Sequence, residues 1–272
     1  MTRHICTKPD PRAELLLQGR LHNPYAYLGL HQENERHVVR VFKPHASEIF
    51  LQTDHGSEAL KRVHSDGLFE LYGNKKPRHP YCLHIKENES RLNDGMERLV
   101  HDCYAFTSVI SDFDLHLFNE GKLHQAYRVL GSHAMQINGI PGVRFAVWAP
   151  NAERVSVIGE FNRWDGRIHP MATHGSSGVW ALFIPDVEQG MLYKYEIRNH
   201  AGILLTKTDP YANAFELRPG TAARAGSCIH HKWQDAEWMD QRNSWDWLHA
   251  PLSIYEIHAG SWKRHPDGRF YT

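Results

Sequence analysis

Short stretches in which apolar and polar residues alternate follow one another along most of the chain. Four of them lie in its first third, are rich in β-branched or aromatic residues and are separated by Gly, Pro, Asp and Asn: residues 37–42, 48–51, 68–72 and 81–85. This pattern predicts antiparallel strands joined by turns, as in a β-sandwich. Before them, Asp10 and Pro11 can begin a short helix that Gly19 ends.

The same order of signals then occurs a second time. Five pairs of segments resemble each other: 23–31 and 125–133, 39–46 and 145–152, 67–72 and 178–183, 81–85 and 193–197, and 102–105 and 209–212. A recurring set of strands with matched turn residues predicts two similar sandwiches in tandem. One large sheet of many strands is the alternative.

We therefore expect a mainly β fold with two tandem antiparallel, immunoglobulin-like β-sandwiches. The expected boundaries are a helix within residues 1–20, sandwiches at 21–118 and 119–220, a linker at 221–250 and a last region at 251–272. The tryptophans of the linker are expected to pack against a neighbouring domain, as large aromatic side chains usually do: Trp233, Trp238, Trp245 and Trp247. In the last region, residues 252–257 predict the beginning of a new strand.

Composition restricts the partners of this chain. Its 272 residues include 31 Lys and Arg and 31 Asp and Glu, a balance that favours a neutral polymer over nucleic acid or an anionic membrane. The apolar runs are far shorter than the roughly 20 residues that span a bilayer. We recognise no secretory signal and expect a cytoplasmic location.

Cysteine and histidine indicate no metal site or cofactor. The four cysteines are scattered and are expected to be reduced thiols: Cys6, Cys82, Cys103 and Cys228. The 21 histidines form no metal-binding motif, and His230 and His231 are adjacent rather than spaced along a helix.

The aromatic turn at residues 161–166, Phe-Asn-Arg-Trp-Asp-Gly, is the best candidate for a binding site. A pyranose has apolar C–H faces and a hydroxyl rim, so its recognition needs a flat aromatic side chain with amide or cationic donors nearby. Trp164 would supply the flat aromatic side chain, and Asn162 and Lys194 would supply the donors. Gly166 would allow a tight bend at φ values that other residues avoid. Alternatively, Trp164 caps the sandwich core and Asn162 only stabilises the turn.

Three motifs together resemble a known family. Residues 143–166, with 186–197 and 209–212, are similar to the starch- and glycogen-binding modules of carbohydrate-binding family 48. The motif at 23–31 resembles the additional N-terminal module of the 1,4-α-glucan branching enzyme family, and 253–262 resembles the start of its glycoside hydrolase family 13 barrel. The central motif alone would also fit debranching enzymes, trehalohydrolases or a kinase regulatory subunit, but the other two favour branching enzymes.

The resemblance implies α-glucan, glycogen or a linear 1,4-glucan, as the ligand of Trp164, Asn162 and Lys194. In the family a second tryptophan follows the lysine strand, whereas this chain has Gly-Ile-Leu-Leu at 202–205, so we expect weak binding there. The catalytic barrel of the full-length protein would be a second partner.

The resemblance also implies a retaining transfer of a glucan chain to a 6-hydroxyl, which needs two carboxylates about 5 Å apart in a (β/α)8 barrel. No carboxylate here matches them, Glu256 included, so we assign no catalytic residue and expect an inactive fragment truncated at the first barrel strand. Two alternatives remain: a stand-alone glycogen-binding or scaffolding protein, and a module that only packs against the barrel.

Overall fold

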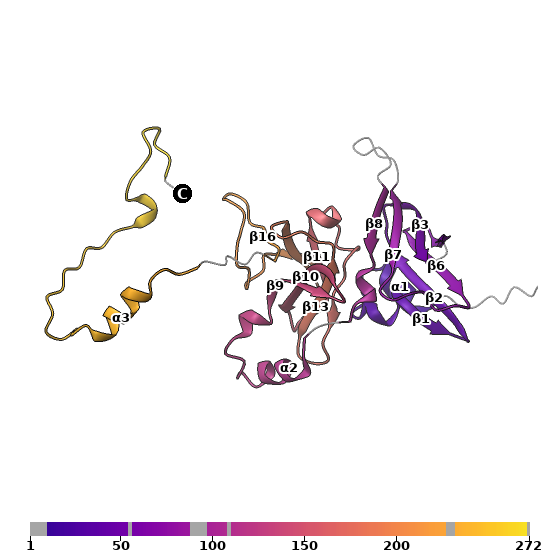
Figure 1. Cartoon of the computed structure of the whole chain (residues 1–272). Helices are drawn as coiled ribbons and strands as arrows, with labels where there is room; N and C mark the ends of the chain where they lie inside the picture. Colours follow the sequence, from indigo (N-terminus) through magenta and orange to yellow (C-terminus); the bar gives the residue numbers. More distant parts are fainter. Residues whose placement is uncertain (1–9, 54–55, 88–96, 108–109, 227–231, 271–272) are drawn as a thin grey trace, which may run out of the picture. The chain divides into compact units, whose positions relative to one another are not determined.

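The computed structural model describes residues 10–53, 56–87, 97–107, 110–226 and 232–270 (Figure 1). The chain divides into two units, residues 1–229 and 230–272, and the first contains both sandwiches. Cys82 and Cys103 carry free thiols. Cys6, Cys228, His230 and His231 lie outside the described residues.

The first sandwich consists of two four-stranded sheets with antiparallel pairing. One sheet has the order β1 (Gly29–Glu33), β2 (Arg36–Phe42), β6 (Leu68–Gly73) and β5 (Lys61–His64). The other has the order β4 (Gly56–Ala59), β3 (Ala46–Thr53), β7 (Cys82–Glu87) and β8 (Glu97–His101). The four strands predicted here are confirmed as β2, β3, β6 and β7, whose apolar side chains form the core between the sheets.

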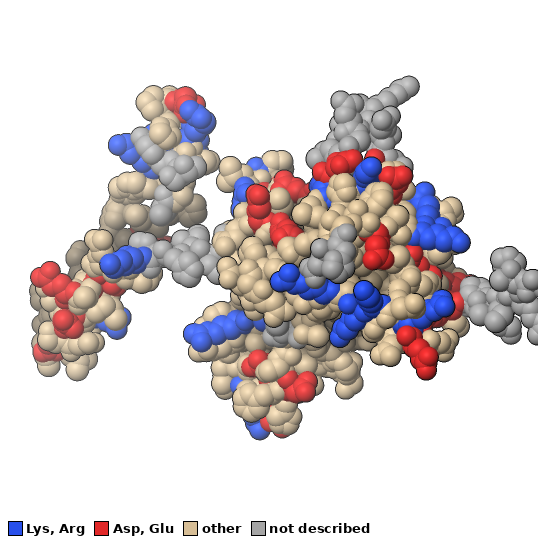
Figure 2. Space-filling model, turned by 45° about the vertical axis from the view of Figure 1, so that its right-hand side comes forward, with Lys and Arg blue, Asp and Glu red and all other residues tan. Residues whose placement is uncertain are grey.

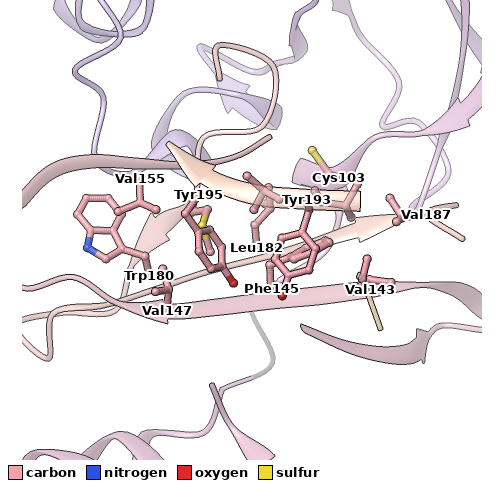
Figure 3. Close-up of a cluster of buried hydrophobic side chains, with 14 of the residues drawn as sticks. Cys103, Val143, Phe145, Val147, Val155, Trp180, Leu182, Val187, Tyr193 and Tyr195 are labelled. Atoms are coloured by element: carbon pink, nitrogen blue, oxygen red, sulfur yellow. The ribbon is translucent and has the colours of Figure 1, made fainter. Parts of the chain in front are cut away.

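The second sandwich has the same construction. Its first sheet has the order β12 (Ala172–Thr173), β13 (Val179–Pro185), β10 (Ile140–Trp148) and β9 (Gly131–Ile137). The second sheet has the order β11 (Ala152–Gly159), β14 (Leu192–Asn199) and β15 (Leu204–Lys207), with β16 (Ala223–Arg224) paired to β14. Phe145, Trp180, Tyr193 and Tyr195 fill the core between them (Figure 3).

The predicted tandem repeat is confirmed by strand order and by side chains. The order β1-β2-β6-β5 corresponds to β9-β10-β13-β12, and β3-β7-β8 corresponds to β11-β14-β15. In each half a buried aspartate accepts a hydrogen bond of 2.5 Å from a tyrosine hydroxyl, Tyr81 to Asp102 and Tyr193 to Asp209. The alternative of one large sheet is therefore wrong.

Each sandwich is also covered by a short helix. The predicted helix α1 (Pro11–Leu17) is capped by Asp10 and packs on the outer face of the first sheet. The helix α2 (Asp112–Asn119) was not predicted, and it packs on the equivalent sheet of the second sandwich. The boundary expected between residues 118 and 119 falls within this helix.

The two sandwiches share apolar clusters within the first unit. Phe183 of β13 is buried in the core of the first sandwich, where its ring lies 5.2 Å from that of Phe106. In the other direction, Cys103 joins the core of the second sandwich, and Tyr104 packs against it. Cys103 and Tyr104 belong to the 3-10 turn η2 (Cys103–Ala105) at the end of the first repeat.

The region after the sandwiches differs from the expected one in two respects. Strand β16 lies inside the range 221–250, so the predicted linker begins after it. No strand forms at residues 252–257 in the described part of the chain, so the beginning of a barrel strand there stays a prediction. A strand requires a neighbour for its backbone N–H and C=O groups, whereas the side chains of this segment are exposed.

The second unit contains the helix α3 (Ala236–Ser244) and the 3-10 turn η5 (Ala259–Ser261). The four tryptophans that were expected to pack against a neighbouring domain are exposed in this unit, and that packing stays a prediction. None of the helices in the described segments has the length and apolarity that crossing a bilayer would require.

Candidate functional site

The aromatic turn follows β11 and has an unusual backbone. After the 3-10 turn η4 (Glu160–Asn162), both Arg163 and Trp164 adopt left-handed conformations, with φ of 56° and 60°. Trp164 N donates to the carbonyl of Gly159 at 3.0 Å. The Trp164 residue is 40% exposed, so its indole does not serve as a buried cap of the core.

Asn162 lies beneath this turn and is only 3% exposed. Its Oδ1 accepts from Gly159 N at 2.9 Å, and its Nδ2 donates to Val157 O at 2.8 Å and lies 3.0 Å from Nδ1 of His169. The geometry therefore fits the alternative in which Asn162 stabilises the turn. Burial, with a contribution from the charge of Lys43, lowers the pKa of His169 well below its ordinary value.

Gly166 does not have the conformation that was expected of it. The left-handed residues are Arg163 and Trp164, not Gly166. A Cβ atom at position 166 would overlap the carboxylate of Glu196 on β14. Glycine thus permits a close approach of the turn to the sheet, and the expected role in φ is corrected.

Trp164 lines a hollow of about 550 Å3 on the outer side of the second sandwich. Leu204 of β15, 53% exposed, lines the same hollow and adds an apolar side chain to it. Polar residues of the second sandwich and residues of the first repeat complete the walls: Arg154, Arg163, Asp165, Gly166, Arg167, Glu196, Arg198, Leu17, Gln18, Gly19 and His45.

Both carboxylates of the hollow are engaged in ion pairs. Glu196 is paired with the buried guanidinium of Arg154. Asp165 accepts from Nη2 of Arg167 at 2.6 Å and lies 3.0 Å from Nε2 of His45. Burial alone would raise the pKa of Asp165, but the hydrogen bonds from Arg167 and His45 lower it. The hollow therefore offers charged donors and acceptors to hydroxyl groups.

Lys194 lies on the outer face of β14, opposite Ile158 and two residues before Glu196. Its Nζ donates to Thr221 Oγ1 at 2.6 Å. Lys194 is absent from the walls of the hollow as the described residues form them. The structure thus joins Trp164 and Asn162 in one turn and places Lys194 beside the hollow, on the same sheet. Basic and acidic side chains are interspersed on the face seen in Figure 2, in keeping with the balanced charge.

Two family models match the two repeats. Residues 10–104 match the N-terminal domain of alpha-1,4-glucan branching enzyme GlgB, and residues 129–212 match carbohydrate-binding module 48 (isoamylase N-terminal domain). Each family model thus covers one of the two sandwiches. The second match begins after α2 and ends before β16, so it covers the aromatic turn and the strands β9 to β15.

Individual branching enzymes are similar over nearly all of this chain. The 1,4-alpha-glucan branching enzyme GlgB of Nitrosospira multiformis is 57% identical over 266 residues, which cover 97% of this chain and 36% of the relative. The enzyme of the same name from Nitrosomonas europaea is 52% identical, with 97% of this chain and 35% of the relative covered. The chain therefore spans about a third of the length of these curated relatives.

Several residues of the hollow were not anticipated from the sequence. Leu204 could have been found, because it stands in the segment where the carbohydrate-binding family has its second tryptophan. The ion pair between Arg154 and Glu196 joins two predicted strands, and it could have been found only if the register between those strands had been known. The contributions of Gln18 and His45 carry no local signal, since they come from the first repeat.

Proposed function

We propose that this chain binds α-glucan, either glycogen or a linear 1,4-glucan, as the N-terminal glucan-binding part of a branching enzyme. The observation that carries this proposal is the 40% exposure of Trp164 on a left-handed turn at the edge of a hollow. An indole held in this way can stack on the apolar face of a glucose unit.

The polar residues around the indole support a neutral polyhydroxyl ligand. Arg167 and Arg198 can donate to glucan hydroxyls, and Asp165 can accept from them. Each of these charges has an oppositely charged partner, so the hollow requires no charge on its ligand. We assign the apolar contacts to Trp164 and to Leu204, whose side chain is smaller than the tryptophan of the family.

The other two residues expected at the site receive different roles in this proposal. Lys194 is a donor to a further glucose unit along the outer face of β14, after exchange of its contact with Thr221. Asn162 acts through the turn that it supports, because all its polar atoms are already hydrogen-bonded beneath it.

Affinity electrophoresis in gels that contain glycogen tests this function. We expect retardation of the wild-type chain and loss of most of it in Trp164→Ala. Trp148→Ala is the matched control, because Trp148 is an exposed indole of the same sandwich that lies outside the hollow. Unretarded migration of the wild-type chain, or equal retardation of wild type and Trp164→Ala, would refute the proposal.

We further propose that the full-length protein transfers α-1,4-glucan chains to 6-hydroxyls in glycogen biosynthesis, in the cytoplasm, with a catalytic barrel as the partner of these domains. Retaining chemistry needs two carboxyl groups about 5 Å apart, one as acid and one as nucleophile. No carboxylate of this chain matches those of the family, so we assign both to the barrel. Purified chain should therefore leave the iodine absorbance of amylose unchanged, and a falling absorbance would contradict this assignment.

A further inference from the structure

The turn that carries Trp164 requires support from outside itself. Two consecutive residues with side chains, Arg163 and Trp164, have φ between 56° and 60°. Left-handed backbone at non-glycine residues persists only where surrounding contacts hold it. Inside the second sandwich, Asn162 and the bond from Trp164 N to Gly159 O supply part of that support.

The remaining support comes from the first sandwich. Glu87, the last residue of β7, has a side chain that is only 7% exposed, and it accepts from Arg163 through one oxygen and from Arg98 through the other. His45, between β2 and β3, places Nε2 3.0 Å from Oδ2 of Asp165. Both neighbours of Trp164 in the sequence are thus tied to the first repeat, across 76 and 120 positions of the chain.

We propose that Glu87 and His45 are positioning residues: the first sandwich holds the Trp164 turn in the conformation that binds glucan. This inference rests on the proposed function. It also explains why residues of the first repeat, Gln18 and His45 among them, stand in the wall of the hollow. Neither Glu87 nor His45 has to touch the ligand for this effect, because each acts on a neighbour of the indole.

The experiment must distinguish weaker contact between the two sandwiches in general from a specific effect on the Trp164 turn. His101 offers a control for this purpose. Its ring Nδ1 lies 3.0 Å from Oδ2 of Asp186, a contact between the sandwiches that lies outside the hollow. His101→Gln replaces the ring contact with Asp186, to which the backbone N–H of residue 101 still donates, and leaves the contacts of Glu87 and His45 with the turn unchanged. Glu97→Gln is the control for loss of a carboxylate, since Glu97 pairs with His84 and Lys86 of its own sandwich.

The experiment measures glycogen affinity and amide hydrogen exchange in Glu87→Gln, His45→Ala and the two controls. If the competent turn falls to about 10–20% of the population, apparent affinity weakens about fivefold to tenfold. Exchange at the amides of Gly159, Trp164 and Asp165 should become faster in the same variants, because these N–H groups are bonded only within the turn. Both controls should match wild type in both measurements.

Two variants protect the test against misfolding. Glu87 is buried, and Glu87→Gln could affect the first sandwich, whereas His45 is partly exposed and its substitution removes a single contact. Unchanged exchange at the turn in both variants would overturn the inference, whatever happens to affinity, and so would an equal effect of His101→Gln. If wild type does not bind glycogen, the proposed function fails, while faster exchange at the turn still supports the positioning role.

Discussion

The hydrogen bond between Asn162 and His169 determines a protonation state. Because Oδ1 of Asn162 accepts from Gly159 N, the amide nitrogen Nδ2 must be the atom that faces His169. An amide nitrogen only donates, so Nδ1 of His169 is an acceptor and the imidazole is neutral. Protonation would place two donors against each other in a buried site, in agreement with the lowered pKa of His169.

This neutral histidine predicts a loss of stability in mild acid. Histidine in an unfolded chain titrates near pH 6.5, and the folded pKa of His169 lies well below that value. Below about pH 6.5 the unfolded state binds the additional proton, so the free energy of unfolding falls by up to about 1.4 kcal/mol per pH unit until the folded pKa is reached. Above about pH 6.5 the neutral His169 makes its full contribution to the free energy of unfolding.

Denaturant unfolding at pH 7.5, 6 and 5 measures this effect. His169→Gln should show a smaller decrease than wild type, because a glutamine oxygen can accept from Asn162 but takes up no proton in this range. His116→Gln, on the exposed side of α2, is the control. Identical pH profiles of wild type and His169→Gln would rule out the neutral buried imidazole as the cause.

The part of the site that could be predicted is the part encoded by neighbouring residues. Trp164 was identified because an aromatic residue, an amide and a glycine stand within one turn. The burial of Asn162 could not be seen, since it depends on His169 and on the path of β11 beneath the turn. Glu87 could not be found at all, because its partner Arg163 is 76 positions away.

Strands and helices were predictable where one of their faces is buried. In β7 buried and partly buried residues alternate, whereas the last five residues of β2 are all buried; in both strands the apolar residues are clear in the sequence. β4 and β5 are exposed along their full length, so no burial pattern marks them. The helix α2 was missed although its Ser111 cap accepts from Asp114 N at 3.0 Å, a Ser-x-x-Asp signal that resembles a capping box.

The repeat extends to the glycine that begins each first strand. Gly29 has a φ of 90° and Gly131 a φ of 97°. In both places a Cβ atom would come within 3 Å of a carbonyl oxygen, at 2.8 Å from Tyr104 O and at 2.9 Å from Tyr211 O. Each tyrosine belongs to the Asp-x-Tyr segment that closes its sandwich, so the same backbone contact occurs twice.

We therefore expect Gly29→Ala and Gly131→Ala to destabilise their sandwiches by similar amounts, about 1–3 kcal/mol each, from strained φ and from the collision with backbone. Denaturant midpoints measure the loss. Gly73→Ala is the control, because its φ is not positive and its new Cβ would meet no atom closer than 3.7 Å. A loss confined to one of the two glycines would show that the repeats differ at this contact.

At the level of the first unit, the two sandwiches cannot be separated without exposing apolar surface. Phe183 belongs by sequence to the second repeat but lies in the core of the first, with Met135, Ile137 and Ile140 packed beside it. Domain boundaries drawn from the sequence do not reveal this sharing. The continuous apolar run of β13 shows that its residues are buried, but not which sandwich buries each of them. Glu87 and His45 add polar links to the same contact region.

Shared burial predicts that damage at Phe183 spreads to both repeats. Phe183 is 1% exposed, and truncation of a buried phenylalanine to alanine costs about 3–5 kcal/mol. In Phe183→Ala, amide exchange should become faster in β3 and β7 of the first sandwich as well as in β10 of the second, because the cavity opens the core of the first. Phe113→Ala, a substitution on the exposed side of α2, should leave exchange in both unchanged. Faster exchange in the second sandwich alone would mean that the first sandwich is stable without Phe183. The support that the first sandwich gives to the Trp164 turn would then come from Glu87 and His45, with no contribution from the shared core.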